Sequence, residues 1–294
     1  MLAQPPKRDP APVAGSPTQS AGGIAPAPAL QLATGFAPRW PGLDGLHERL
    51  PYARYHEDPA LRHSVLNRIS VSPAFLKLSL ELGGDDSTAK TQGRVFHLLA
   101  LEPELAEHQV VRVNVGSRNA NLYKSAVETN PGKDVILLHE WEELGRLAEL
   151  LRAKGIWNDL VRGAKIEASL FWAMRTGLRL KARPDILRLS DGVVADLKTT
   201  RDLRYFKRDA EEYGYYRQLA LQSDGVEALS ARRPDLHLLI AVCKRTRDFK
   251  IFEVGRKTME TAHRENRRNL ALYDECARTD VWPGFPQRVE VLAP

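Results

Sequence analysis

Three successive segments between residues 164 and 200 show the alternation of apolar and polar side chains that is typical of β-strands. They read AKIEASLFW, GLRLKARPD and GVVADLKTT. Only short turns separate them, so they are predicted to pair as an antiparallel meander. Helical periodicity dominates the sequence on both sides. Strands in the middle with helices before and after predict an α/β (α+β) domain, in which helices cover a mixed sheet.

The flanking elements follow from caps and breaks. Ser72 and Pro73 suit the N-cap and first position of a helix whose apolar side includes Phe75 and Leu76. A second helix is predicted over STAKTQGRVFHLLALEP and ends at Pro103. Further helices are predicted at residues 118–128, 139–153, 202–229 (as one or two helices) and 256–276, and further strands at VVRVNV, NPGKDVILL, LHLLIAVC and FKIFEV.

The first 42 residues differ in composition from the rest. Nine of the 19 prolines fall in residues 1–41, where Asp9 is the only acidic residue. Such a stretch buries too little apolar surface to offset its ordering entropy, so residues 1–42 are predicted to be a disordered tail and residues 43–294 one domain. The tail lacks the apolar core of a signal peptide, and no 18-residue apolar run occurs, so we expect a cytoplasmic protein without a membrane partner.

Charge and cysteine content narrow the function classes. The formal charge is +6, and residues 244–268 hold nine Lys or Arg against four Asp or Glu. A basic face suits a polyanion, but a solvated helix and turn explain the same charges, and composition leaves both open. Cys243 and Cys276 form no CxxC pair for zinc or an iron-sulfur cluster. The sequence also lacks a phosphate-binding GxxxxGK[ST] loop, a GxSxG nucleophile motif and an HExxH zinc pair.

The segment ARPDILRLSDGVVADLKTT can bring three charged side chains together. Asp196 and Lys198 lie two residues apart on a predicted strand and therefore point to the same face. If Asp191 and Gly192 form a type I′ turn, Asp185 lies opposite Lys198 and diagonal to Asp196. Two carboxylates and an ammonium then converge within about 5 to 8 Å.

This arrangement suits hydrolysis of a phosphodiester. Carboxylates hold Mg²⁺, and a nearby lysine stabilises charge that develops on a phosphate. The spacing also fits a surface ion pair, and spacing alone does not decide between them. Pro-Asp and Asp-x-Lys recur at Asp235, Asp248 and Lys250, but there eight extended residues hold the two aspartates about 25 Å apart. We therefore expect this second set to be a strand start and a turn.

Four segments together carry a family resemblance: RYHEDPALRHSVLNRISVSPAFLKL, QGRVFHLLALEPE, KIEASLFWAMRTGLRLKARPDILRLSDGVVADLKTTRDLRYF and YRQLALQSDGVEAL. In content and order they resemble the exonuclease VIII-type (RecE-like) branch of the PD-(D/E)xK nucleases over roughly residues 52–285. The resemblance implies a restriction-endonuclease-like mixed sheet flanked by helices. It also implies a Mg²⁺-dependent site, with Mn²⁺ as a substitute, that degrades linear duplex DNA, usually from 5′ ends.

By position, the resemblance implies that Asp185 and Asp196 are the metal carboxylates, that the main-chain oxygen of Leu197 is a further ligand, and that Lys198 is the catalytic lysine. His97 matches a helix histidine that adds a metal ligand. Each has a plainer alternative: His97 also fits a histidine that is hydrogen-bonded near the core.

Other implied residues lie on neighbouring elements. Glu167 is either a further acidic contact of the site or an exposed strand residue. Gln218 contacts DNA or positions the site, with an ordinary surface amide as the alternative. The related pattern has a tyrosine where this chain has Gln222. The cations Arg201, Arg204 and Lys207 could follow a DNA backbone, with solvated charge as the alternative.

The resemblance implies double-stranded DNA ends as substrate, a single-strand annealing recombination protein as partner, and a ring-shaped homo-oligomer. Two other functions fit the same residues. One is a structure- or site-specific endonuclease with the same site. The other is a non-catalytic DNA-binding module, which the intact Asp185, Asp196 and Lys198 disfavour.

Overall fold

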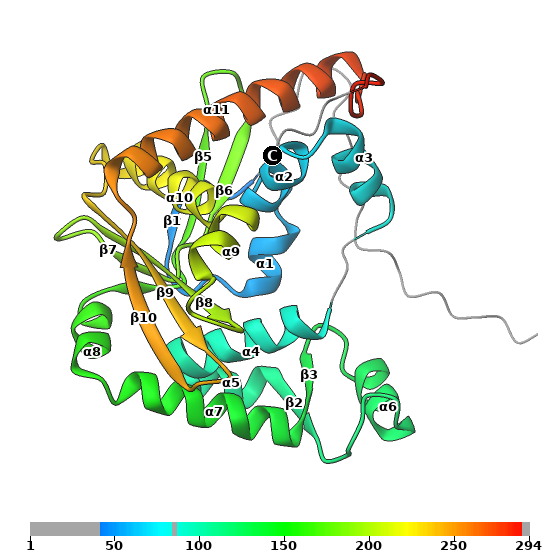
Figure 1. Ribbon diagram of the computed structural model, residues 1–294, viewed down its shortest axis with the longest axis vertical. Helices are drawn as coiled ribbons and strands as arrows, with labels where there is room; N and C mark the ends of the chain where they lie inside the picture. The colour runs from blue at the N-terminus through cyan, green and yellow to red at the C-terminus, as the bar shows by residue number, and fades with distance from the viewer. Residues whose placement is uncertain (1–41, 84–86, 290–294) are drawn as a thin grey trace, which may run out of the picture.

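The computed structural model describes residues 42–83 and 87–289 (Figure 1). The segment predicted as a tail lies outside these residues, except for Gly42. The largest sheet contains β4 (Lys165–Ile166), β7 (Ile186–Arg188), β8 (Val193–Thr200), β9 (Leu236–Cys243) and β10 (Asp248–Glu253). Its strand order is β10-β9-β8-β7-β4, and only the β8–β9 pair is parallel. The predicted mixed sheet is therefore confirmed.

Two smaller sheets accompany it. A three-stranded antiparallel sheet has the order β1-β5-β6, and β2 pairs with β3 in parallel. Their bounds are β1 (Gly45–His47), β5 (Ser169–Ala173), β6 (Arg179–Ala182), β2 (Val110–Val113) and β3 (Asp134–Leu137).

Helices cover both faces of the large sheet (Figure 1). One core joins the sheet to α2 (His63–Ile69), α3 (Pro73–Glu81), α10 (Tyr215–Ser230) and α11 (Arg256–Thr279). The other core joins it to α4 (Thr88–Leu101), α7 (Leu138–Arg152) and α8 (Gly155–Val161). The remaining helices are α1 (Tyr52–Glu57), α5 (Pro103–Gln109), α6 (Asn121–Thr129) and α9 (Phe206–Glu212).

Local signals explain where the helices begin and end. The Ser72 side chain accepts a hydrogen bond from the Phe75 backbone N–H at 3.1 Å, which caps α3 as predicted. Helix α4 ends at Leu101, just before Pro103 opens α5. No helix within the described ranges combines the length and apolar character that crossing a membrane requires.

The predicted meander is confirmed in its pairing but not in its continuity. The segment KIEASLFW breaks at Glu167, whose φ of 49° turns the chain out of the extended conformation and separates β4 from β5. The segment GLRLKARPD forms only β6, because Pro184 near its end has no backbone N–H for a sheet bond, and the separate strand β7 begins directly after it. The three expected strands thus become five, divided between two sheets.

Strand β8 is buried on both faces. Its residues Val193, Ala195 and Leu197 pack into the core with α4 and α7, while Val194 packs into the core with α10. The sequence pattern predicts an apolar face and an open polar face, and the second expectation is wrong because α10 covers it. Asp196 consequently lies between the sheet and α10 with no exposed surface.

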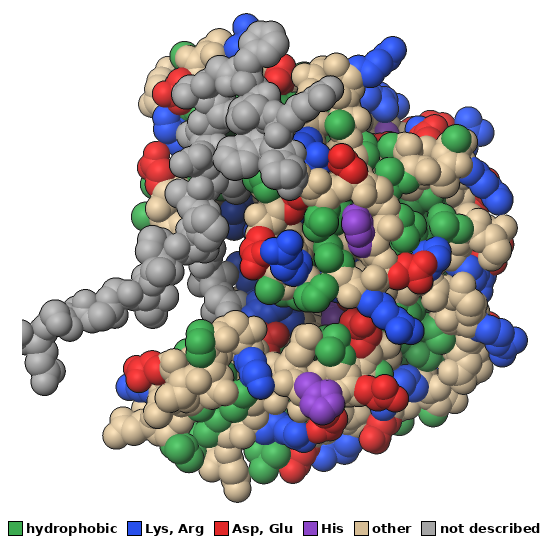
Figure 2. Space-filling model, turned by 180° about the vertical axis from the view of Figure 1, so that it is seen from behind, with side chains coloured by type: hydrophobic (Ala, Val, Ile, Leu, Met, Phe, Trp, Pro, Cys, Tyr) green, Lys and Arg blue, Asp and Glu red, His purple; other side chains and the backbone are tan. Residues whose placement is uncertain are grey.

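The basic segment 244–268 is spread over the β9–β10 turn, β10 and the first half of α11. Arg245 pairs with Asp202 at 2.9 Å, and Arg256 pairs with Glu260 at 2.8 Å. Figure 2 shows both signs of charge interspersed over one face of the molecule. Local pairing of this kind favours the solvated-surface interpretation for these arginines.

Candidate metal centre

The β7–β8 hairpin brings Asp185 and Asp196 together. Arg188 pairs with Val193 across the hairpin, and carrying this register to Asp185 places it beside Asp196. The predicted two-residue turn is therefore wrong, because residues 189–192 form the turn and shift the pairing by two positions. A shift of two keeps every side chain on its face, so the carboxylates still converge. The Leu197 N–H donates to Oδ2 of Asp185 at 2.5 Å and fixes that carboxylate against the strand.

Asp196 is held by three side chains. The Lys198 ammonium forms an ion pair with its Oδ2. Gln218 and Gln222, four residues apart on one face of α10, donate to its Oδ1 at 3.0 and 2.8 Å. Burial lowers the pKa of Lys198, but the negative charges of Asp196 and Asp185 outweigh it and raise the pKa above its usual value. Lys198 is therefore a fixed ammonium at neutral pH.

A second group of side chains lies on the other side of Asp185. His97 of α4 places Nδ1 3.5 Å from Oδ1 of Asp185 and 3.8 Å from Oε1 of Glu167. The three residues offer ligand atoms that all lie within 4.8 Å of one another. Two carboxylates and one imidazole form a donor set that suits a divalent ion such as Mg²⁺ or Mn²⁺. The residues present therefore fit a metal.

The charges in this group are strongly coupled. Burial opposes the positive form of His97, but the carboxylates of Asp185 and Glu167 prevail and raise its pKa to about 10. Burial and the negative charge of Asp196 raise the pKa of Asp185 to about 6, against the opposing effect of His97. Without a metal ion, the imidazolium of His97 therefore balances the negative charge of the two carboxylates at neutral pH.

Glu167 is placed by its backbone and by one arginine. Its φ of 49° is rare for a residue with a side chain, and such strain gathers at functional sites. Arg183 donates to Oε2 of Glu167 at 2.7 Å and to the Leu50 carbonyl at 3.0 Å. Of the two interpretations of Glu167, the structure supports the acidic contact of the site. Arg183 escaped the sequence reasoning, although it directly precedes Pro184 and Asp185.

The predicted site residues fall into three sets. The structure brings His97, Glu167 and Asp185 together, and it puts Asp196, Lys198 and Gln218 beside them. Leu197 lies between, with its backbone N–H on Asp185, and the role predicted for its main-chain oxygen stays a prediction.

The predicted DNA-binding cations are not gathered in one place. Arg201 lines a cavity beside Lys198, whereas Arg204 is tied to Asp202 at 2.7 Å and Lys207 is exposed on α9.

Gln222 is the residue that sequence reasoning undervalued. The related pattern has a tyrosine at this position, so from the sequence the glutamine puts a stacking or hydrogen-bonding role of α10 in doubt. In the structure it is 1% exposed and contacts Asp196 directly. The signal was present in the spacing, because Gln218 and Gln222 are four residues apart and share a helix face.

The chain is similar to one family and to several solved structures. The family model described as a PDDEXK-like domain of unknown function (DUF3799) matches residues 63–293. A protein from Eubacterium rectale named as a candidate exonuclease superposes with a TM-score of 0.59 at 13% identity, over 84% of this chain and 97% of its own. A phage-related exonuclease from Haemophilus somnus gives a TM-score of 0.28 at 14% identity, over 61% and 92%. No curated protein matches the chain.

Proposed function

The chain belongs to the PDDEXK-like domain family DUF3799, within the PD-(D/E)xK nuclease superfamily, and we propose that it is a Mg²⁺-dependent exodeoxyribonuclease that hydrolyses linear double-stranded DNA. One observation carries the proposal: the cluster of His97, Glu167 and Asp185 lies directly beside the ion pair between the buried Asp196 and the half-buried Lys198. Burying several charges in one place is costly unless they pair or bind an ion. Their arrangement has a clear chemical use in phosphodiester hydrolysis.

Each side chain has a separate task in this proposal. His97, Glu167 and Asp185 would hold a divalent ion, which when bound would supply the charge that polarises a phosphate oxygen and lowers the pKa of water. Lys198 stabilises the negative charge that develops on the phosphate, and its ion pair with Asp196 keeps the ammonium in place.

Three residues position these groups. Gln218 and Gln222 hold the Asp196 carboxylate, so they act through it on Lys198. Arg183 orients Glu167 from the opposite side. The contacts of Asp196 are with Lys198, Gln218 and Gln222, so we assign it first to positioning the lysine, and its predicted ligand role stays a prediction.

The proposal includes features that the family resemblance implies. We propose that cleavage runs 5′ to 3′, that Mn²⁺ replaces Mg²⁺, and that the enzyme works in phage-type recombination beside a single-strand annealing protein. A ring-shaped homo-oligomer is the proposed assembly. The intact metal and lysine groups support turnover and disfavour the non-catalytic module.

The test compares linear duplex DNA with the same DNA as a covalently closed circle, each with Mg²⁺ and with EDTA. We expect rapid loss of the linear form, an unchanged circle, and no reaction in EDTA. Nicking of the circle would establish the endonuclease instead. Binding to linear DNA without product would establish the non-catalytic module, and cleavage in EDTA would remove the metal from the proposal. Substrates labelled at the 5′ or the 3′ end then report the polarity.

A further inference from the structure

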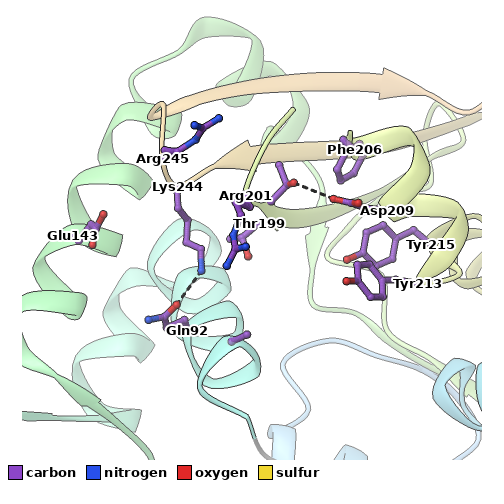
Figure 3. Close-up of a pocket in the computed structure, with 12 residues that line it drawn as sticks. Gln92, Glu143, Thr199, Arg201, Phe206, Asp209, Tyr213, Tyr215, Lys244 and Arg245 are labelled. Atoms are coloured by element: carbon purple, nitrogen blue, oxygen red, sulfur yellow. Dashed lines mark hydrogen bonds between the residues drawn. The ribbon is translucent and has the colours of Figure 1, made fainter. Parts of the chain in front are cut away.

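A cavity of about 610 Å³ opens near Lys198. Figure 3 shows the side chains that line it. The cavity lies at the C-terminal end of β8, and α4, α7, α9, the start of α10 and the β9–β10 turn form its walls. Its size falls in the range of about 300–1,000 Å³ that is typical of ligand pockets. The mechanism above uses none of the side chains that line it.

The cavity borders one of the proposed catalytic groups, Lys198. The ring of Tyr215, which forms part of its wall, lies with its centroid 4.9 Å from the Lys198 ammonium. On the opposite wall, Gln92 belongs to the same helix as His97. The cavity thus adjoins Lys198 on one side and the helix that carries His97 on the other.

An aromatic wall faces this space. Tyr213 and Tyr215 lie side by side, with ring centroids 5.9 Å apart and an interplanar angle of 36° (Figure 3). Tyr215 is largely covered, whereas Tyr213 is 53% exposed and leaves its ring open to solvent. Exposed rings beside a cationic groove are the platform on which unpaired nucleobases stack.

Two cations in the cavity have no acidic partner. Neither Arg201 nor Lys244 lies within ion-pair distance of a carboxylate in the described chain; the ammonium of Lys244 instead donates to Oε1 of Gln92 at 2.9 Å. Arg245, by contrast, is paired with Asp202. The acidic lining residues are Glu143 and Asp209, and Asp209 already accepts a hydrogen bond from the Thr200 hydroxyl at 3.5 Å.

We propose that the cavity binds an unpaired nucleotide at the end of the DNA strand that is cleaved. Its nucleobase would stack on Tyr213, and its phosphodiester would lie between Arg201 and Lys244. This inference rests on the proposed function and adds a requirement to it: the strand end must leave the duplex, so that a single unstacked nucleotide is recognised by its flat base.

The test measures binding in EDTA, where the DNA stays intact. Fluorescence anisotropy compares a duplex with a four-nucleotide single-stranded end and the same duplex with abasic sites in that end. Loss of one base stack weakens binding by about five- to a hundredfold. We expect wild type to bind the abasic DNA less tightly by such a factor, and Tyr213→Ala to bind both DNAs equally. Tyr213→Phe, which keeps the ring, should retain the preference.

Controls separate this inference from the proposed function. Tyr205→Ala removes a tyrosine that is 52% exposed but lies outside the cavity, and it should keep the wild-type preference. Lys244→Gln should weaken binding to both DNAs alike and lower the salt dependence by about one phosphate contact. If wild type binds both DNAs equally, or if Tyr213→Ala loses affinity for both by the same factor, the cavity proposal is wrong while the nuclease stands. Absence of any DNA binding would overturn both.

Discussion

Two hairpins of this chain carry the same short pattern, Pro-Asp followed on the next strand by Asp-x-Lys, and they lie in opposite environments. In the β7–β8 hairpin, Asp185 and Asp196 are 5% and 0% exposed. In the β9–β10 hairpin, Asp235, Asp248 and Lys250 are all exposed. Asp235 precedes β9, while Asp248 opens β10 opposite the last residue of β9, so the two aspartates lie at opposite ends of one strand.

The difference comes from the place of each strand in the sheet. β8 is a central strand with helices on both faces, so both its apolar and its charged side chains become wholly or partly buried. β10 is an edge strand, and its charged residues alternate toward solvent. Charged groups at a surface cost little, whereas buried ones must be paired or used. The pattern Asp-x-Lys therefore gains meaning only from the strand that carries it.

The largest expected difference between the two hairpins is in cleavage rate. Lys198→Ala removes the ammonium next to the proposed metal cluster and should slow DNA cleavage by about 10²- to 10³-fold, as loss of one preorganised charge does. Lys250→Ala should leave the rate unchanged. Single-turnover cleavage of linear DNA measures both, and retained DNA binding shows that Lys198→Ala has folded. Equal rates for the two variants would remove Lys198 from the mechanism.

Metal affinity should separate the aspartates in the same way. Asp185→Asn removes a proposed direct ligand. Mutation of a residue that only contacts a ligand weakens metal binding by about 10- to 100-fold, so the affinity of Asp185→Asn for Mn²⁺ should fall by more than this. Asp248→Asn should bind Mn²⁺ as wild type does. Calorimetric titration of the metal-free proteins with Mn²⁺ checks both, and unchanged affinity in Asp185→Asn would place the ion elsewhere.

Gln222 donates a hydrogen bond to Asp196, and among the described residues no glutamine makes such a contact with Asp235 or Asp248 of the exposed hairpin. Gln222→Ala should lower kcat by about 10- to 100-fold, as removal of an outer partner does, with little change in KM. A purely structural role would instead lower the melting temperature and leave the rate of the folded enzyme unchanged. Gln287→Ala, at an exposed position, serves as the matched control.

A half-buried histidine of the site, His97, and a buried one on β9, His237, extend the contrast to pH. His97 in the site is held charged, whereas burial lowers the pKa of His237 on β9 to about 4. Between pH 6.5 and 4 the unfolded chain binds a proton at His237 that the folded chain does not, so stability falls as pH falls through this window. The loss amounts to up to about 3 kcal/mol, at about 1.4 kcal/mol per pKa unit. Denaturant unfolding across this range should show a smaller pH dependence in His237→Leu, and an unchanged dependence would contradict the assignment.

Much of the fold follows from local sequence signals. Ser72 with Pro73 places the start of α3, and Pro103 places the end of α4, because capping and missing N–H groups act within one turn. The break at Glu167 was not predictable, since no glycine or proline marks it. Nor was the turn of the β7–β8 hairpin, where the Arg188 side chain binds Asp191 and stabilises a four-residue turn in place of the tighter Asp-Gly one.

The sequence predicts which residues form the site more reliably than it predicts how they are arranged in space. The alternation rule places Asp196 and Lys198 on one face whatever the turn, so an error of two positions in register was harmless. The cover of α10 and the contact of Gln222 depend on tertiary packing. Arg183 likewise carries no local signal, because its partner Glu167 lies 16 residues away.

A crystal structure of the protein soaked with Mn²⁺, in which anomalous scattering locates the ion, tests the metal centre most directly. We predict a peak bound by Asp185, Glu167 and His97, a few ångströms from Lys198. A protein that Mn²⁺ activates but whose ion lies away from these three side chains would contradict this prediction.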